Sequence, residues 1–499
     1  MSNIKKLAGQ TMWYGVSSIA ARFLNYLVTP YLTNVLLPEN YGIMSLVYSV
    51  LPFLNVLFTY GMETAFFRFS NNGANKDTIY NTTASSILIS TLCFGITLLL
   101  FHHQLAVFAG VGNYPELIRL SVFIIMIDTL TIIPFAKLRY DGRPVKYAMA
   151  KISGIVAYLI FTYFFLSVCY VHAKSDPTSF YAKLVDTSRN PVYYIVVANL
   201  IQAIVTLLFL YKEILAIRFK IDKKLWRQVM VYSMPLIIVG MGGVINETMD
   251  RIMLKWWVPG TDKFKATQVG IYSACYKLSL LISLFVQAFR MGAEPFFFKQ
   301  AEAENPQRTY ARVMKFFVII ICIMFLVVAL YLNIWKYFIA EKLWGGLTVV
   351  PILLLANMFL GIYYNLSIWY KLGHKTSAGA YITLTGAAIT IIINYYFIPR
   401  FSYMACAWAT FFCYGSMMIF SFVWGQKEYK VPYPWKKLCA YIIIAVLLFF
   451  IHKTIGSFTD SKIISFATAT FLLAMYMWFI GQVEKKELVK LPVVGKYFT

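Results

Sequence analysis

Two arginines lie in apolar stretches of the chain that are long enough to cross a bilayer. Arg22 is followed about twenty residues later by Gly-Ile-Met-Ser at 42–45, and Arg251 is followed at a similar distance by Gly-Ile-Tyr-Ser at 270–273. An arginine at the centre of a membrane helix costs roughly 2.5–3.5 kcal/mol on an insertion scale, so a retained one marks a functional site. The pattern predicts two repeats and a cavity lined with positive charge.

Further polar residues share these apolar stretches. Side chains three or four positions apart lie on one face of a helix, so Arg22, Asn25 and Thr29 form a polar stripe. The hydroxyls on such a stripe suit a helix–helix interface.

The charged and polar residues of the apolar stretches fall into three candidate groups. The candidate substrate-binding residues are Arg22, Asn25, Arg251 and Lys277. The candidate coupling or charge-balancing residues are Glu63, Asp128, Glu247 and Asp250, and the candidate cytoplasmic gate is Arg290 and Glu294.

Each of these charged groups has two interpretations. Glu247 or Asp250 either forms an internal ion pair with an arginine or binds a coupling cation or proton. Asp128 either neutralises Arg22 or titrates. Arg290 and Glu294 either form the gate or simply pair and extend towards the interface. Walls rich in arginine suit a phosphate or diphosphate, which a guanidinium binds through two parallel hydrogen bonds.

The composition is that of an all-α polytopic membrane protein. Of 499 residues, 60% are hydrophobic and 13% are charged, and apolar runs of about 20 residues, the length that spans a bilayer, recur throughout. We expect about fourteen transmembrane helices, centred near Ile19, Val50, Cys93, Ile125, Ile160, Leu200, Gly243, Leu281, Cys322, Ala356, Thr390, Cys413, Val446 and Leu472.

The net charge of +24 follows the expected topology. With both termini in the cytoplasm, cytoplasmic segments hold roughly 30 of the 45 lysines and arginines and the other side about 11. This distribution argues against nucleic-acid binding and predicts a multi-pass membrane protein with both termini in the cytoplasm. The cysteines and histidines show no metal-ligand spacing, so we expect no cofactor, apart from coupling to H+ or Na+.

The domain organisation follows from the repeat. If the second repeat begins six spans after the first, both have the same orientation in the membrane. We expect an N-terminal lobe of six spans over 1–213, a basic cytoplasmic linker over 214–228, a C-terminal lobe of six spans over 229–426, and two extra helices with a cytoplasmic tail over 427–499. No loop is long enough to form an independent domain of about 50 residues.

These motifs resemble those of the oligosaccharide-lipid flippases of the multidrug/oligosaccharidyl-lipid/polysaccharide exporter superfamily. The matching segments share their order and spacing with that family: Thr11 and Arg22, Leu-Leu-Pro-Glu-Asn-Tyr-Gly at 36–42, Tyr-Gly-Met-Glu at 60–63, Tyr-Asp-Gly-Arg at 140–143, Asp-Arg at 250–251, Val-Gly-Ile-Tyr-Ser at 269–273, and Ala-Phe-Arg at 288–290 with Pro-Phe at 295–296. The resemblance implies two six-helix lobes in a V, two further helices, and alternating access.

The resemblance also implies a function. The expected cargo is a polyprenyl-diphosphate-linked oligosaccharide for O-antigen, capsule or exopolysaccharide assembly, flipped to the outer leaflet, with downstream polymerase or export proteins as partners. Two alternatives share the architecture, namely a multidrug or cation exporter and a flippase for the peptidoglycan precursor. An enzyme such as a membrane glycosyltransferase is disfavoured, because the longest external loop offers only Asp176 and Asp186 as acids.

Overall fold

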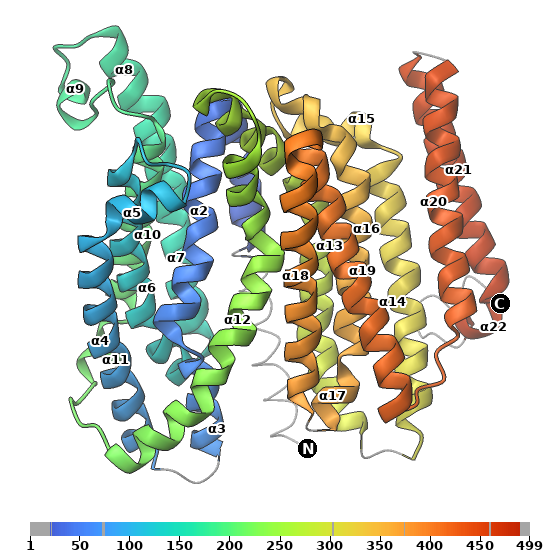
Figure 1. Cartoon of the computed structure of the whole chain (residues 1–499), viewed down its shortest axis with the longest axis horizontal. Coiled ribbons are helices and arrows are strands. Elements are labelled where there is room, and N and C mark those ends of the chain that lie inside the picture. Colours follow the sequence, from blue (N-terminus) through green and yellow to red (C-terminus); the bar gives the residue numbers. More distant parts are fainter. Residues whose placement is uncertain are drawn as a thin grey trace. The chain divides into compact units, whose positions relative to one another are not determined.

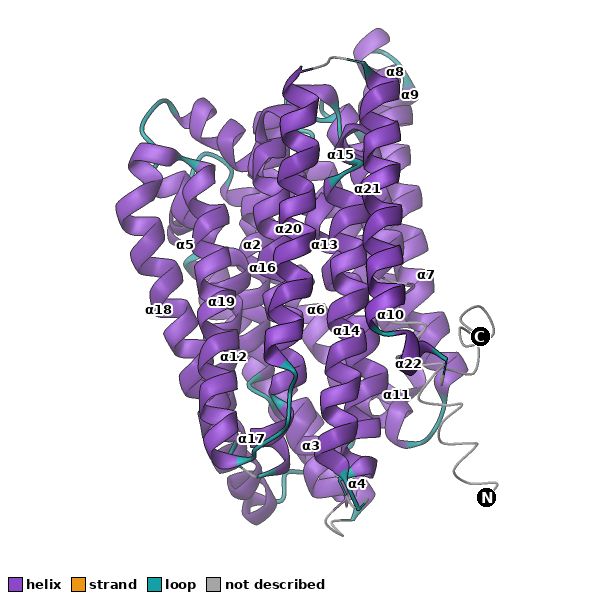
Figure 2. Ribbon diagram, turned by 90° about the vertical axis from the view of Figure 1, so that its right-hand side faces the viewer, coloured by secondary structure: helices purple, strands orange, loops and turns teal. Residues whose placement is uncertain are grey.

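The computed structural model describes residues 20, 22–71, 75–301, 304–373, 375–458 and 461–489. Throughout these residues the regular structure is helical, as Figure 2 shows. Thirteen of the described helices are long and apolar enough to cross a membrane, and they contain the thirteen later span centres. The expected all-α polytopic fold is therefore confirmed. The first centre, Ile19, lies outside the described residues, although the chain is helical over 22–35.

The chain divides into two compact units, which differ from the expected lobes. Unit 1 comprises Met1–Ala274 and Thr383–Ala409, and unit 2 comprises Cys275–Ile382 and Thr410–Thr499. Three long helices have residues in both: α13 (Asp262–Gln300), α18 (Thr376–Phe401) and α19 (Tyr403–Glu428). The expected lobes and linker stay predictions, since these units are defined by compactness and not by the repeat.

Unit 1 is built on long helices that pack side by side. In Figure 1, α6 lies against α4 and α10, and α12 lies against α2. Its complete helices are α2 (Pro38–Thr59), α3 (Met62–Asn71), α4 (Lys76–Leu100), α5 (His102–Phe108), α6 (Pro115–Tyr140), α7 (Pro144–Tyr163), the π-helix η1 (Phe164–Cys169), α8 (Tyr170–Ser175), α9 (Phe180–Leu184), α10 (Val192–Phe209), α11 (Tyr211–Leu215) and α12 (Lys223–Trp257).

Unit 2 contains the C-terminal helices. Helix α14 packs against α16, α20 and α21. Its complete elements are α14 (Pro306–Ala329), α15 (Leu332–Trp335), the 3-10 helices η2 (Lys336–Phe338) and η3 (Glu341–Val349), α16 (Val350–Leu366), α17 (Ile368–Leu372), α20 (Trp435–Phe458), α21 (Lys462–Val483) and α22 (Lys485–Leu488).

Local sequence signals explain where several of these helices begin. Pro38, Pro115 and Pro144 stand in the first turn of α2, α6 and α7, where no backbone N–H is needed and the fixed φ suits a helix. Asn75 caps α4, its Oδ1 accepting from the backbone N–H of Asp77 at 2.9 Å, and Asp222 caps α12 by accepting from Leu225 at 3.0 Å. The helix boundaries are therefore encoded locally.

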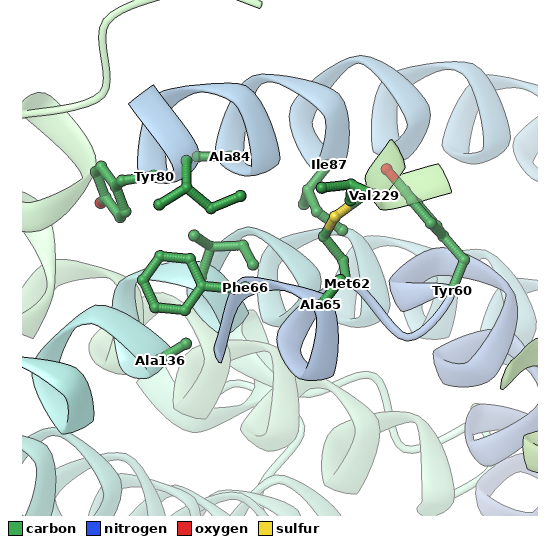
Figure 3. Packing of buried hydrophobic residues seen from close by; sticks show 11 residues of the cluster. Tyr60, Met62, Ala65, Phe66, Tyr80, Ala84, Ile87, Ala136 and Val229 are labelled. Atoms are coloured by element: carbon green, nitrogen blue, oxygen red, sulfur yellow. The ribbon is translucent and has the colours of Figure 1, made fainter. Parts of the chain in front are cut away.

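The turn between α2 and α3 is fixed by a core cluster. Tyr60 and Gly61 adopt left-handed backbone angles (φ 33° and 70°), which end α2. Buried side chains from α3, α4, α6 and α12, including Met62, Ile79 and Val229, then pack around this turn (Figure 3). The cluster holds the start of α12 against the first helices of the chain.

The two glycine motifs of the proposed repeat meet in unit 1. A Cβ added to Gly42 of α2 would lie 2.9 Å from the backbone nitrogen of Gly270 of α13, and one added to Gly270 would lie 3.0 Å from the nitrogen of Gly42. Such approaches are too short for any side chain. The two segments that match in sequence thus form one close backbone crossing.

Candidate substrate-binding site

Helix α12 places Asp250 and Arg251 in a buried ion pair. The guanidinium Nη1 of Arg251 donates to Asp250 Oδ1 at 3.1 Å, and its backbone N–H donates to the same oxygen at 2.8 Å. Asp250 is only 2% exposed, and the Arg251 side chain 12%. This is the internal ion pair that the sequence offered as one of two interpretations of this segment.

The second oxygen of Asp250 is held by a tyrosine from α13. The Tyr272 hydroxyl donates to Asp250 Oδ2 at 2.5 Å, and the ring of Tyr272 lies 5.8 Å from the guanidinium carbon of Arg251. A buried carboxylate is tolerated only where its oxygens are paired and hydrogen-bonded. Asp250, Arg251 and Tyr272 therefore form one interdependent group, the Asp250 cluster, which ties α12 to α13.

Several other predicted site residues of unit 1 are exposed, two on the helix that precedes α2 and two on membrane-spanning helices. Arg22 and Asn25 lie on the helix over 22–35, Asp128 lies on α6, and Glu247 lies on α12. Lys151 of α7 is close enough to act electrostatically on Asp128. Hydrocarbon does not solvate ionised side chains, so the exposed faces of α6 and α12 that carry Asp128 and Glu247 suit contact with water or polar groups.

Glu63 has a partner that the sequence did not indicate. Its carboxylate forms an ion pair with Arg139, which joins α3 to α6. The Arg139 guanidinium also lies 4.9 Å from the ring centre of Phe67. The Glu63 side chain is 42% exposed and the Arg139 side chain 32%. The pair therefore balances charge at the ends of these helices and is not part of the buried core.

In unit 2, Lys277 is half-buried on α13, and Arg290 lies further along the same helix. The Arg290 guanidinium stacks on Tyr364 of α16, 4.7 Å from its ring centre. Between these helices is a cavity of about 10 Å³, enough for one water molecule. Asn365 lines it, and its Oδ1 is buried without a hydrogen-bond partner. The side chain of Glu294, the other gate residue, lies outside the described residues.

The structure thus brings together some of the predicted site residues and not others. Asp250 and Arg251 form one group, whereas Glu63 pairs elsewhere, and Lys277 and Arg290 belong to unit 2. Sequence reasoning missed Tyr272 and Arg139 as partners. Tyr272 belongs to the second glycine motif, at residues 270–273, and its place in that motif is the sequence feature that could have pointed to it. Among the described residues no cluster of three or more His, Cys, Asp or Glu side chains could hold a metal ion.

Solved structures with the same fold are transporters and flippases. The model matches "Lipid II flippase MurJ, inward closed conformation" with a TM-score of 0.69 and 12% identity, covering 95% of this chain and 98% of that one. It matches an inward-facing multidrug resistance MATE transporter of the MOP superfamily with a TM-score of 0.62 and 13% identity, over 82% of this chain and 94% of that one. An outward-facing MATE structure gives a TM-score of 0.55 and 15% identity, over 85% and 95%.

The chain therefore shares its fold with these polytopic membrane transporters and flippases. A family model described as "Polysaccharide biosynthesis protein" matches residues 7–300, and the chain belongs to this family. The expected family is thus confirmed, and the fold agrees with that of a solved transporter of the MOP superfamily. No curated protein sequence matches the chain. These matches point to transport rather than to catalysis.

Proposed function

We propose that the protein flips a polyprenyl-diphosphate-linked oligosaccharide from the cytoplasmic to the outer leaflet for surface polysaccharide assembly. The observation that carries the proposal is that a chain from a polysaccharide biosynthesis family has exposed charged side chains, with Asp128 and Glu247 on spanning helices and Arg22 on the helix over 22–35. An arginine in that position suits a diphosphate that enters the membrane body with its lipid. The chain would lie in a bacterial inner membrane with both termini in the cytoplasm.

In the proposed mechanism the diphosphate meets Arg22, Arg251 and Lys277, with Asn25 as a hydrogen-bonding group, while the polyprenyl tail stays in lipid. Asp250 already neutralises Arg251, so Arg251 would act as an oriented hydrogen-bond donor rather than as a source of net charge. Export of an anion from an inside-negative cell is favoured by about 2.3 kcal/mol per charge per 100 mV. Proton or sodium coupling through Asp128, Glu247 or Glu63 would add to this driving force.

The test is glycan display on cells that lack this chain and are complemented with variants. Arg22→Ala and Lys277→Ala should each reduce display and leave lipid-linked glycan on the cytoplasmic leaflet. Arg251 needs a paired variant, Asp250→Asn with Arg251→Gln, because removing the arginine alone leaves a buried carboxylate unpaired. Lys183→Ala is the charge-matched control for each single variant, since it also removes one positive charge and the lysine is exposed in the 172–190 segment.

The results separate this function from its alternatives. Normal display in all charge variants would contradict pairing with the diphosphate. Normal display in the deletion strain, with altered sensitivity to cationic drugs, would support a multidrug exporter. Loss of peptidoglycan synthesis in that strain, with precursor held on the inner leaflet, would support a flippase for the peptidoglycan precursor.

A further inference from the structure

The connection between α11 and α12 carries a dense group of cations. Within residues 215–227, which we name the basic strip, five basic side chains are all exposed: Arg218, Lys220, Lys223, Lys224 and Arg227. Residues 217–222 are not helical, and α12 begins at Lys223. The strip is thus partly extended chain and partly the first turns of a spanning helix.

Hydrogen bonds to α4 fix the path of the strip. The backbone N–H of Arg218 donates to Asn81 Oδ1 at 2.8 Å, and the backbone N–H of Asp222 donates to Thr82 Oγ1 at 3.2 Å. Trp226 Nε1 donates to Ser86 Oγ at 2.9 Å. Asn81 and Thr82 are neighbours in α4 and Ser86 lies one turn further along, so the strip is tethered to two successive turns of α4.

Packing of two apolar side chains also orients the strip. Ile217 and Leu225 point inward and pack against the core cluster of Figure 3. Four other apolar side chains of the strip stay exposed: Leu215 at 80%, Phe219 at 73%, Trp226 at 38% and Ile221 at 37%. The exposed face of the strip therefore alternates apolar and basic groups.

The two acidic residues next to these cations in the sequence, Glu213 and Asp222, already have hydrogen-bond partners. Asp222 caps α12, and the buried carboxylate of Glu213 accepts from Lys146 Nζ at 2.6 and 2.7 Å, with Arg143 at 3.5 Å. In the described part of the chain no carboxylate pairs with any of the five strip cations. The exposed face thus presents uncompensated positive charge beside uncovered apolar surface.

A phospholipid headgroup layer provides a match for both features. Phosphates lie at its surface, and apolar chain begins just beneath them. A soluble phosphate would satisfy the cations alone and leave Phe219 and Leu215 in water. The strip also lies near the start of two spanning helices, where a membrane boundary is expected: it includes the first turn of α12 and contacts the second and third turns of α4.

We propose that the basic strip binds anionic phospholipids of the adjoining leaflet, with its cations on the phosphates and Leu215, Phe219, Ile221 and Trp226 inserted below them. This binding is separate from the cargo site. It anchors the connection between α11 and α12 to the lipid surface, and the topology proposed above makes that leaflet the cytoplasmic one.

The experiment measures retained lipid by native mass spectrometry of the full-length protein, titrated with phosphatidylglycerol or phosphatidylcholine in detergent. The wild type should retain phosphatidylglycerol preferentially. The triple variant Lys220→Gln, Lys223→Gln, Lys224→Gln should weaken retention by at least about tenfold, and Phe219→Ser should weaken it less. The matched control is Lys427→Gln, Lys430→Gln, Lys436→Gln, which removes the same charge from exposed positions of unit 2.

Three outcomes would overturn the proposal. Equal retention of the two lipids by the wild type would remove the charge argument, and an equal loss in the control would show a response to total charge. Displacement of the lipid by inorganic diphosphate alone would assign the strip to a soluble phosphate. Unchanged melting temperatures of the variants confirm that they fold. Because the assay contains no glycan, its result is independent of the proposed flippase activity.

Discussion

Gly42 of α2 and Gly270 of α13 lie backbone to backbone, and each occupies a position where the other helix leaves no room for a Cβ. The contact is reciprocal: the Cβ of Gly42 would meet the carbonyl of Ala266, four residues before Gly270, and the Cβ of Gly270 would meet the carbonyl of Pro38, four residues before Gly42. Small residues permit such crossings between membrane helices. The glycines of the two motifs are thus explained by one shared contact.

Replacing either glycine should separate these helices. We expect Gly42→Ala or Gly270→Ala to destabilise the protein by about 1–3 kcal/mol, because the new methyl group overlaps backbone that cannot rotate away. The measurement is the melting temperature in detergent. Gly243→Ala on α12 is the control, since its Cβ would meet nothing within 4 Å and alanine is the better helix former. Equal effects at the three positions would refute the close crossing.

The Asp250 cluster should respond as a unit. Tyr272→Phe removes one hydrogen bond to a buried carboxylate and should cost about 1.5–3 kcal/mol. Asp250→Ala leaves Arg251 without its carboxylate and should cost about 3–5 kcal/mol. Because the groups share partners, the double variant should lose less than the sum of the two single changes. Strict additivity in thermal unfolding would show that the tyrosine and the carboxylate act separately.

A second buried carboxylate should make stability depend on pH. Glu484, 2% exposed, accepts from Lys315 Nζ at 2.6 Å and from the Tyr441 hydroxyl at 2.5 Å. Burial alone would raise the pKa of Glu484, but hydrogen bonds from Lys315 and Tyr441 and the charges of Lys315 and Lys437 outweigh it, so the pKa lies below its usual 4.5. The ionised Glu484 carboxylate therefore contributes fully to the free energy of unfolding above pH 4.5. This contribution is lost as the pH falls through the lowered pKa of the folded protein.

The melting temperature between pH 3 and pH 7 tests this dependence. The wild type should lose stability towards the acid end of that range, and Glu484→Gln should start from a lower stability and show a flatter profile. Glu428→Gln serves as a comparison, because its ion pair with Lys375 is partly exposed. Parallel profiles for wild type and Glu484→Gln would assign the acid sensitivity to other groups.

The Glu63–Arg139 pair allows stability and transport to be separated. Because both side chains are partly exposed, Glu63→Gln should change the free energy of unfolding by no more than about 1 kcal/mol. If Glu63 takes part in coupling, glycan display in complemented cells should nevertheless fall. Unchanged display at unchanged stability would restrict Glu63 to surface charge balance.

Much of the fold could be predicted from local patterns. Apolar runs of bilayer length give thirteen spans that agree with the helices, and proline and Asn or Asp caps mark the starts of α2, α4 and α12. The interpretation of the Thr29 hydroxyl as part of a helix–helix interface agrees with its burial, at 2% exposure. These features depend on length, hydropathy and residues within one or two turns.

Hydropathy and residue order are enough to predict that this chain spans a membrane many times, which apolar segments contain charged residues, and where the two similar motifs lie. They do not reveal which charges neutralise each other, because that depends on contacts between helices. Tyr272 lies 22 positions from Asp250 and Arg139 lies on a different helix from Glu63, so their pairing depends on how each helix is rotated and packed. The same holds for Gly42 and Gly270, since a missing Cβ has meaning only where another backbone takes its place.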